Sequence, residues 1–146
     1  MHFTGDTVKV EDLVALCPVE PTVTFRKGEP RSMRPNARSC ATSGISFCVS
    51  DARFEAFERQ KADAIAFLAK HAAALAKLSD LPGLEHASID FGIAMRNVVA
   101  QSDGFDSELI RLLAPLRLEL VLSQYPVGRK MKRVKEFRRA LRKHSA

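Results

Sequence analysis

The sequence has no tryptophan, one tyrosine and three cysteines among its 146 residues. Cys17, Cys40 and Cys48 are odd in number and show no C-x-x-C spacing, which argues against both a disulfide framework and a structural zinc site. We therefore expect reduced thiols and no bound metal. Cys48 has no neighbouring base in the sequence to lower its pKa, so a small strand residue is the favoured interpretation of this cysteine over a nucleophile.

Long apolar runs are also missing. No stretch approaches the roughly 18 consecutive apolar residues that a membrane-spanning helix needs, and residues 1–6 lack the charged and apolar regions of a signal peptide. From these two absences we expect a cytoplasmic protein with no membrane span.

The sequence lacks the short motifs that bind phosphates or catalytic metals. Neither G-x-G-x-x-G nor G-x-x-x-x-G-K-[ST] occurs, and the four histidines show no H-E-x-x-H spacing. Asp90, Glu119 and Glu20 are the carboxylates available for acid–base chemistry, but their spacing does not show that they converge. We therefore predict no catalytic residues and no cofactor, and an enzyme that uses carboxylates on a sheet remains the open alternative.

The positive charge is concentrated at one end of the chain. Residues 127–146 contain nine lysines and arginines and one glutamate, whereas residues 1–126 contain fourteen basic and sixteen acidic residues. At this length and composition the chain fits a single globular core. We therefore divide the sequence into a domain over residues 1–126 and a basic C-terminal tail over residues 127–146.

Hydrophobic periodicity predicts the elements of the domain. Spacing of three and four predicts helices over residues 10–17, 52–78 and 107–114, and alternation predicts strands over 22–26, 44–50, 86–96 and 117–125. Residues 29–43 are rich in proline, arginine and small polar residues and are expected to form a long loop. Ser50 or Asp51 is expected to cap the long helix.

Each predicted strand has an apolar side and a polar side, as in a sheet covered on one face only. We therefore predict an α+β fold: a single antiparallel or mixed sheet with helices packed on one face, followed by a basic helical tail. The polar face is predicted to carry Thr22, Thr24, Arg26, Ser46, Cys48, Ser50, Ser88, Asp90, Gly92, Glu119, Ser123 and Tyr125.

The order of several weak motifs resembles a bacterial family of domains of unknown function, the DUF-4279 type. The matching residues are Pro21-Thr22, Lys27-Gly28-Glu29, Ser43-Gly44 with Ser46, Phe105 with Glu108-Leu109, and Ser123 with Tyr125-Pro126. The resemblance covers residues 3–126 and implies an α+β architecture, but no activity. This chain departs from the family pattern in its short opening strand and in Ile45, where the family tends to have tryptophan.

Two interpretations of function follow. The first is a non-enzymatic module that binds an unknown protein partner, or forms a homodimer, through its open sheet face or a sheet edge. Candidate binding residues are Thr22, Thr24, Arg26, Lys27, Glu29, Asp90, Glu119, Ser123 and Tyr125. The competing interpretation of Lys27-Gly28-Glu29 is a solvated turn in which Gly28 supplies a positive φ.

The alternative is an accessory nucleic-acid-binding protein that acts through its tail. The cations that would contact phosphates are Arg129, Lys130, Lys132, Arg133, Lys135, Arg138, Arg139, Arg142 and Lys143. The same segment also spaces Met131, Val134 and Leu141 so that a helix could dock them on the domain or on a second subunit.

Overall fold

The computed structural model describes residues 1–126, and the predicted tail over residues 127–146 lies outside the described residues. The elements are β1 (His2–Gly5), α1 (Val10–Leu16), β2 (Val23–Phe25), β3 (Ser43–Ser46), α2 (Phe57–Ser79), β4 (His86–Met95), α3 (Ser107–Leu113), a 3-10 turn (Ala114–Leu116) and β5 (Glu119–Pro126). No described helix is both long and apolar enough to cross a membrane.

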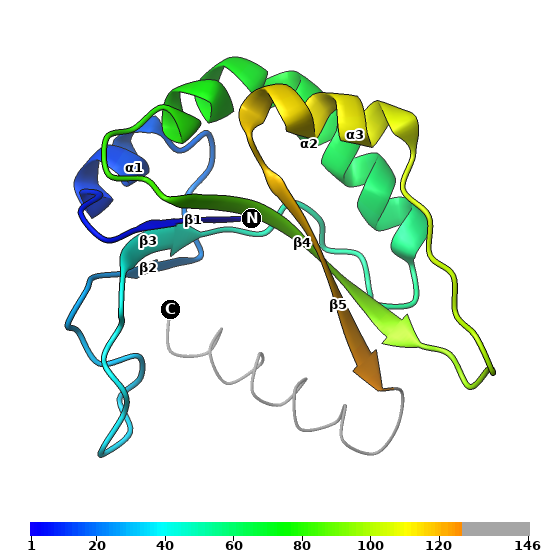
Figure 1. Cartoon of the computed structure of the whole chain (residues 1–146), viewed down its shortest axis with the longest axis horizontal. Helices are drawn as coiled ribbons and strands as arrows, with labels where there is room; N and C mark the ends of the chain where they lie inside the picture. The colour runs from blue at the N-terminus through cyan, green and yellow to red at the C-terminus, as the bar shows by residue number, and fades with distance from the viewer. Residues whose placement is uncertain (127–146) are drawn as a thin grey trace.

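The five strands form one sheet in the order β2-β3-β1-β4-β5. Its pairs are antiparallel except for β4 and β5, which run parallel. The α+β prediction is confirmed, in the mixed rather than the antiparallel form. Figure 1 shows the three helices above the sheet, while no described element covers the hollow face below it. We call this uncovered side the open face.

The core lies between the sheet and the helices. Its fully buried side chains come from every layer and include Phe3, Leu13, Ile45, Leu68, Leu75, Leu78, Ile93 and Leu109. Along β4 the predicted alternation is confirmed, since Ile89, Phe91 and Ile93 are buried and Asp90 is exposed. Burial of these apolar side chains therefore fixes which face of β4 is left open.

The faces predicted for the 22–26 strand are wrong. Val23 and Phe25 pair with Ser46 and Gly44, so their side chains lie on the open face, and a Cβ on Gly44 would meet the ring of Phe25 at 2.9 Å. Thr24 pairs with the buried Ile45 and therefore faces the helix layer. Residues directly opposite each other on neighbouring strands point to the same face of the sheet. The register of β2 with β3 therefore determines the face on which each β2 side chain lies.

The start predicted for the long helix is also wrong. The helix α2 begins at Phe57, and its N-cap is Ala56, which makes no side-chain cap hydrogen bond. The predicted cap Ser50 instead donates its hydroxyl proton to Asp63 and accepts the amide proton of Ala52. Phe54 falls within the helix predicted over residues 52–78, but it lies in the preceding loop, where its carbonyl oxygen accepts the amide proton of Ala94.

The opening strand takes a central place in the sheet. The four-residue strand β1 pairs with β3 on one side and with β4 on the other. Gly5 at its end lies so close to the turn at Gly83 that an added Cβ would be 1.9 Å from the Gly83 carbonyl oxygen. Therefore this short strand both bridges the two halves of the sheet and anchors the turn after α2.

Candidate protein-binding surface

Four of the predicted binding residues gather on the open face of β4 and β5. The parallel register places Asp90 beside Val121 and Gly92 beside Ser123, so the outward side chains of the two strands form one surface. Ser123 Oγ donates a hydrogen bond to Asp90 Oδ2 at 2.9 Å. Glu119 Oε1 lies 3.6 Å from His86 Nδ1 at the other end of the strands. The polar side chains of this surface therefore contact one another.

An aromatic pair completes the surface. Tyr125 stacks on Phe54 with ring centroids 4.6 Å apart and planes within 9° of parallel. Gly92 lies beneath the pair, since a Cβ on it would be 2.8 Å from a ring carbon of Phe54 and 3.2 Å from one of Tyr125. Sequence reasoning missed Phe54, although a glycine inside a strand is a known sign of close approach by another group.

Four of the other five predicted residues lie elsewhere. Thr24 faces the helix layer, Arg26 forms an ion pair with Glu11 of α1, and Lys27 forms one with Asp6. The hydrogen bond from Arg26 holds the pKa of the Glu11 carboxyl below its ordinary value. Glu29 lies in the connection between β2 and β3, where its carbonyl oxygen accepts the amide proton of Cys40. These residues do not form one site with Asp90 and Tyr125.

We expect Lys27→Ala to lower the free energy of unfolding by less than about 1 kcal/mol, because exposed ion pairs contribute little. Both partners of the Lys27–Asp6 pair have about half of their side-chain surface exposed. Urea unfolding of Lys27→Ala, Asp6→Ala and the double variant isolates the energy of the pair itself. A coupling energy well above 1 kcal/mol would show that the turn after β2 depends on this contact.

A pocket of about 280 Å³ lies beside the start of β1, and its lining combines residues of the open face with Gln60 and Ala64 of α2. Its lining includes the predicted Thr22, whose amide donates to the Ser46 carbonyl oxygen, and it also includes His2, Cys48 and Asp90. Burial lowers the pKa of His2, the neighbouring amino group lowers it further, and Asp90 acts in the opposite direction. Among the described residues, no cluster of three or more His, Cys, Asp or Glu side chains forms a candidate metal site.

The edge of the sheet at β5 offers a second surface. β5 is eight residues long and pairs with β4 alone within residues 1–126. On the β1 side of β4, the Gly92 carbonyl oxygen accepts from Gln60 and the Ala94 amide donates to Phe54, so the odd-numbered residues of β4 face β5. By the alternation of a parallel ladder, Leu120, Leu122 and Gln124 direct their backbone N–H and C=O groups to the free edge.

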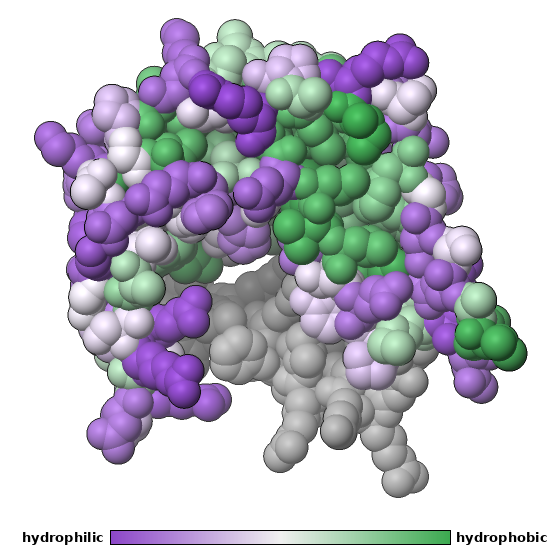
Figure 2. Space-filling view, viewed as in Figure 1, coloured by the Kyte–Doolittle hydropathy of each residue, from purple (hydrophilic) through white to green (hydrophobic). Residues whose placement is uncertain are grey.

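Apolar side chains lie beside this edge. Ile110 of α3 is 44% exposed and Val121 of β5 is 37% exposed, while Leu112, Leu120 and Leu122 are only partly buried. Figure 2 shows apolar surface gathered over α3 and β5. We call Ile110, Leu112, Leu120, Leu122 and the free backbone of β5 the β5 edge surface. Sequence alternation identified the strand but could not show that it lies at an edge.

Comparisons with protein-family models, with curated proteins and with solved structures found no match to this chain. The resemblance to the DUF-4279 type therefore stays a prediction from the order of the motifs.

Proposed function

We propose that this chain is a non-enzymatic protein-binding module that pairs with a second copy of itself through the β5 edge surface. The observation that carries the proposal is an eight-residue strand at the end of the sheet, with apolar surface gathered over it and over α3 (Figure 2). Exposed strand edges present unpaired hydrogen-bonding groups, which readily pair with another strand.

The β5 edge lacks the features that normally prevent such pairing. Proteins protect edge strands with lysines, prolines, bulges or very short strands. Between residues 119 and 125, β5 has no lysine, arginine or proline, and its register with β4 runs without interruption to Pro126. The opposite edge strand, β2, has only three residues. We therefore assign the association to β5 rather than to β2.

We choose a second copy of the chain as the partner of the β5 edge surface because a strand edge can pair with itself symmetrically. A strand can pair antiparallel with itself about a two-fold axis, and the same axis brings one copy of an adjoining patch against the other. Pairing β5 with β5 in this way would extend the sheet and place the two α3 helices side by side. Ile110 and Leu112 would then lose contact with water, which is favourable.

The test is the mass of the full chain in solution across micromolar to submillimolar concentrations, by light scattering and sedimentation. Gln124→Pro removes a backbone donor at the free edge and leaves the bonds to β4 in place. Ile110→Lys puts a charge into the apolar patch. We expect each variant to raise the dimer dissociation constant by about tenfold or more, as for central interface residues.

Val14→Lys is the matched control, because Val14 on α1 is 42% exposed, close to the 44% of Ile110. It should leave the dissociation constant unchanged. The proposal is wrong if the parent protein remains a monomer at the highest concentration, or if Val14→Lys weakens association as much as Ile110→Lys does.

A further inference from the structure

The connection between β2 and β3, expected from its composition to be a long loop, is paired as a hairpin. The Gly28 amide donates to the Cys40 carbonyl oxygen at 2.9 Å, and the Arg31 amide donates to the Arg38 carbonyl oxygen at 2.9 Å. A bridge joins Pro30 and Ser39 between them. We call residues 28–40 the arm.

The tip of the arm is a tight turn. The Ala37 amide donates to the Arg34 carbonyl oxygen at 3.1 Å, and Asn36 takes a left-handed φ of 62°. Met33 at the tip is fully exposed. The arm therefore has a defined backbone that holds its side chains away from the body of the domain.

Three arginines of the arm are left without acidic partners. Arg31, Arg34 and Arg38 are all exposed, and none forms an ion pair within residues 1–126. Elsewhere in this part of the chain, six lysine and arginine side chains pair with carboxylates: Arg26, Lys27, Arg59, Lys61, Arg96 and Arg117. The arm concentrates unneutralised charge, whereas much of the positive charge on the body is neutralised.

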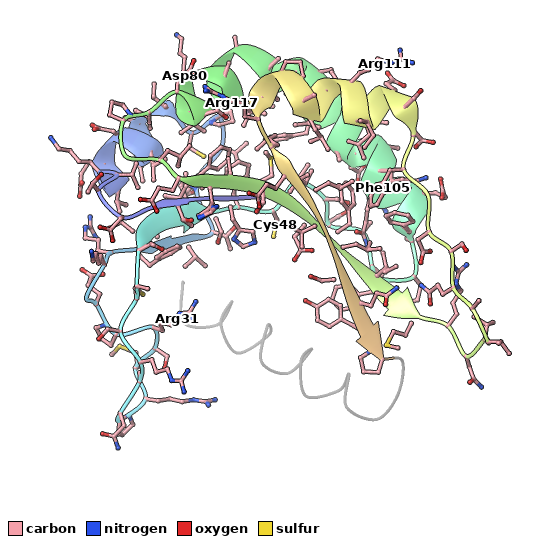
Figure 3. All side chains as sticks on the ribbon, in the orientation of Figure 1. Arg31, Cys48, Asp80, Phe105, Arg111 and Arg117 are labelled. Carbon is pink, nitrogen blue, oxygen red and sulfur yellow. The ribbon has the colours of Figure 1, made fainter. Side chains whose placement is uncertain are left out.

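The arm lies on the same side of the sheet as the open face. Figure 1 shows it extending below the sheet, opposite the helices, and Figure 3 shows Arg31 on the arm beneath that face. The arm leaves from β2, at one end of the strand order, while residue 127 follows β5 at the other end. Four strand spacings separate these edges by about 19 Å.

We propose that the arm binds the sugar–phosphate backbone of nucleic acid, as a second contact beside the basic tail. Arginine suits this task because its planar fork makes two hydrogen bonds to one phosphate group. Two basic segments that follow the two opposite edge strands of the sheet fit an extended polyanion better than a single phosphorylated group. A membrane surface is disfavoured, because the arm exposes only one large apolar side chain, Met33.

The experiment measures binding of the full chain to a fluorescently labelled DNA duplex of mixed sequence, by anisotropy at several salt concentrations. The test variant replaces Arg31, Arg34 and Arg38 with glutamine. Each phosphate contact contributes close to 0.9 to the slope of log K against log salt. If all three arginines contact phosphates, the slope should fall by about 2.7, with affinity reduced at every salt concentration.

A control variant with the same loss of charge distinguishes direct phosphate contacts of the arm from a general effect of net charge. Lys9, Lys70 and Lys77 are exposed residues of the helix layer, and replacing all three with glutamine should change the slope by less than about 1. Circular dichroism of each variant checks that the fold is retained. Because Arg31, Arg34 and Arg38 lie outside the β5 edge surface, this result is independent of dimer formation.

Three results would overturn the proposal. The first is that the parent chain does not bind the duplex or the corresponding single strand at low salt. The second is an equal change of slope in the arm variant and in the lysine control. The third is binding to phosphatidylserine vesicles that needs the arm, while DNA binding does not.

Discussion

Gly5→Ala is expected to lower the free energy of unfolding by at least about 3 kcal/mol, or to prevent folding altogether. A Cβ on Gly5 would lie 1.9 Å from the carbonyl oxygen and 2.9 Å from the carbonyl carbon of Gly83. Both are backbone atoms, so no side-chain rotation can relieve the clash. Either β1 must move out of the centre of the sheet or the turn after α2 must open.

Two other glycines provide controls for this prediction. Gly28 has a φ of +85° but no atom within 4 Å of an added Cβ, so Gly28→Ala measures backbone strain alone, at about 1 kcal/mol. Gly104 likewise has open space around it, and Gly104→Ala should be close to neutral. Urea unfolding of the three variants measures the loss of unfolding free energy that each substitution causes. Equal losses for Gly5→Ala and Gly28→Ala would show that the β1 contact with the turn does not constrain the fold.

The features of the fold that the sequence predicted are those set by local periodicity. Ile89, Phe91 and Ile93 alternate with polar residues, and the structure buries all three. The short helix over residues 107–114 was predicted nearly to its bounds, and Pro115 lies in the 3-10 turn that follows it. In both segments the pattern extends over enough residues that burial of one side favours a single structure.

The features that were missed depend on partners far away in the sequence. The face of Thr24 was set by its register against Ile45, which a three-residue strand cannot specify alone. Phe54 and Phe57 both fit a helical period, yet only Phe57 is helical, because the Phe54 carbonyl oxygen pairs with the Ala94 amide. Local periodicity cannot predict a hydrogen bond between residues that are forty positions apart in the sequence.

The candidate surfaces also combine features that local alternation predicted with features that depend on distant partners. Asp90, Ser123 and Tyr125 were placed together by alternation alone, and their register across parallel strands brings the first two into hydrogen-bonding contact. The edge position of β5 and the hairpin form of the arm follow from strand order and backbone pairing. Composition indicated where the arginines occur in the chain, but not that they would lack acidic partners.

Phe91→Ala is expected to lower the free energy of unfolding by about 3–5 kcal/mol, the usual cost of removing a buried ring from a core. Phe91 is only 3% exposed. Its ring centroid lies 5.9 Å from that of Phe57 and 5.3 Å from that of Phe105, in edge-to-face geometries. The substitution therefore opens a cavity where β4, α2 and the segment before α3 meet, and urea unfolding measures the loss.

Phe54→Ala is the matched comparison, because it removes the same ring from the opposite face of β4. Phe54 is partly exposed and stacks on Tyr125, so its loss should cost about 1–2 kcal/mol and leave no enclosed cavity. The difference between the two variants measures how unequally the two faces of the sheet contribute to stability. If Phe54→Ala cost as much as Phe91→Ala, the open face would have to be regarded as a second core, since only enclosed packing gives losses of that size.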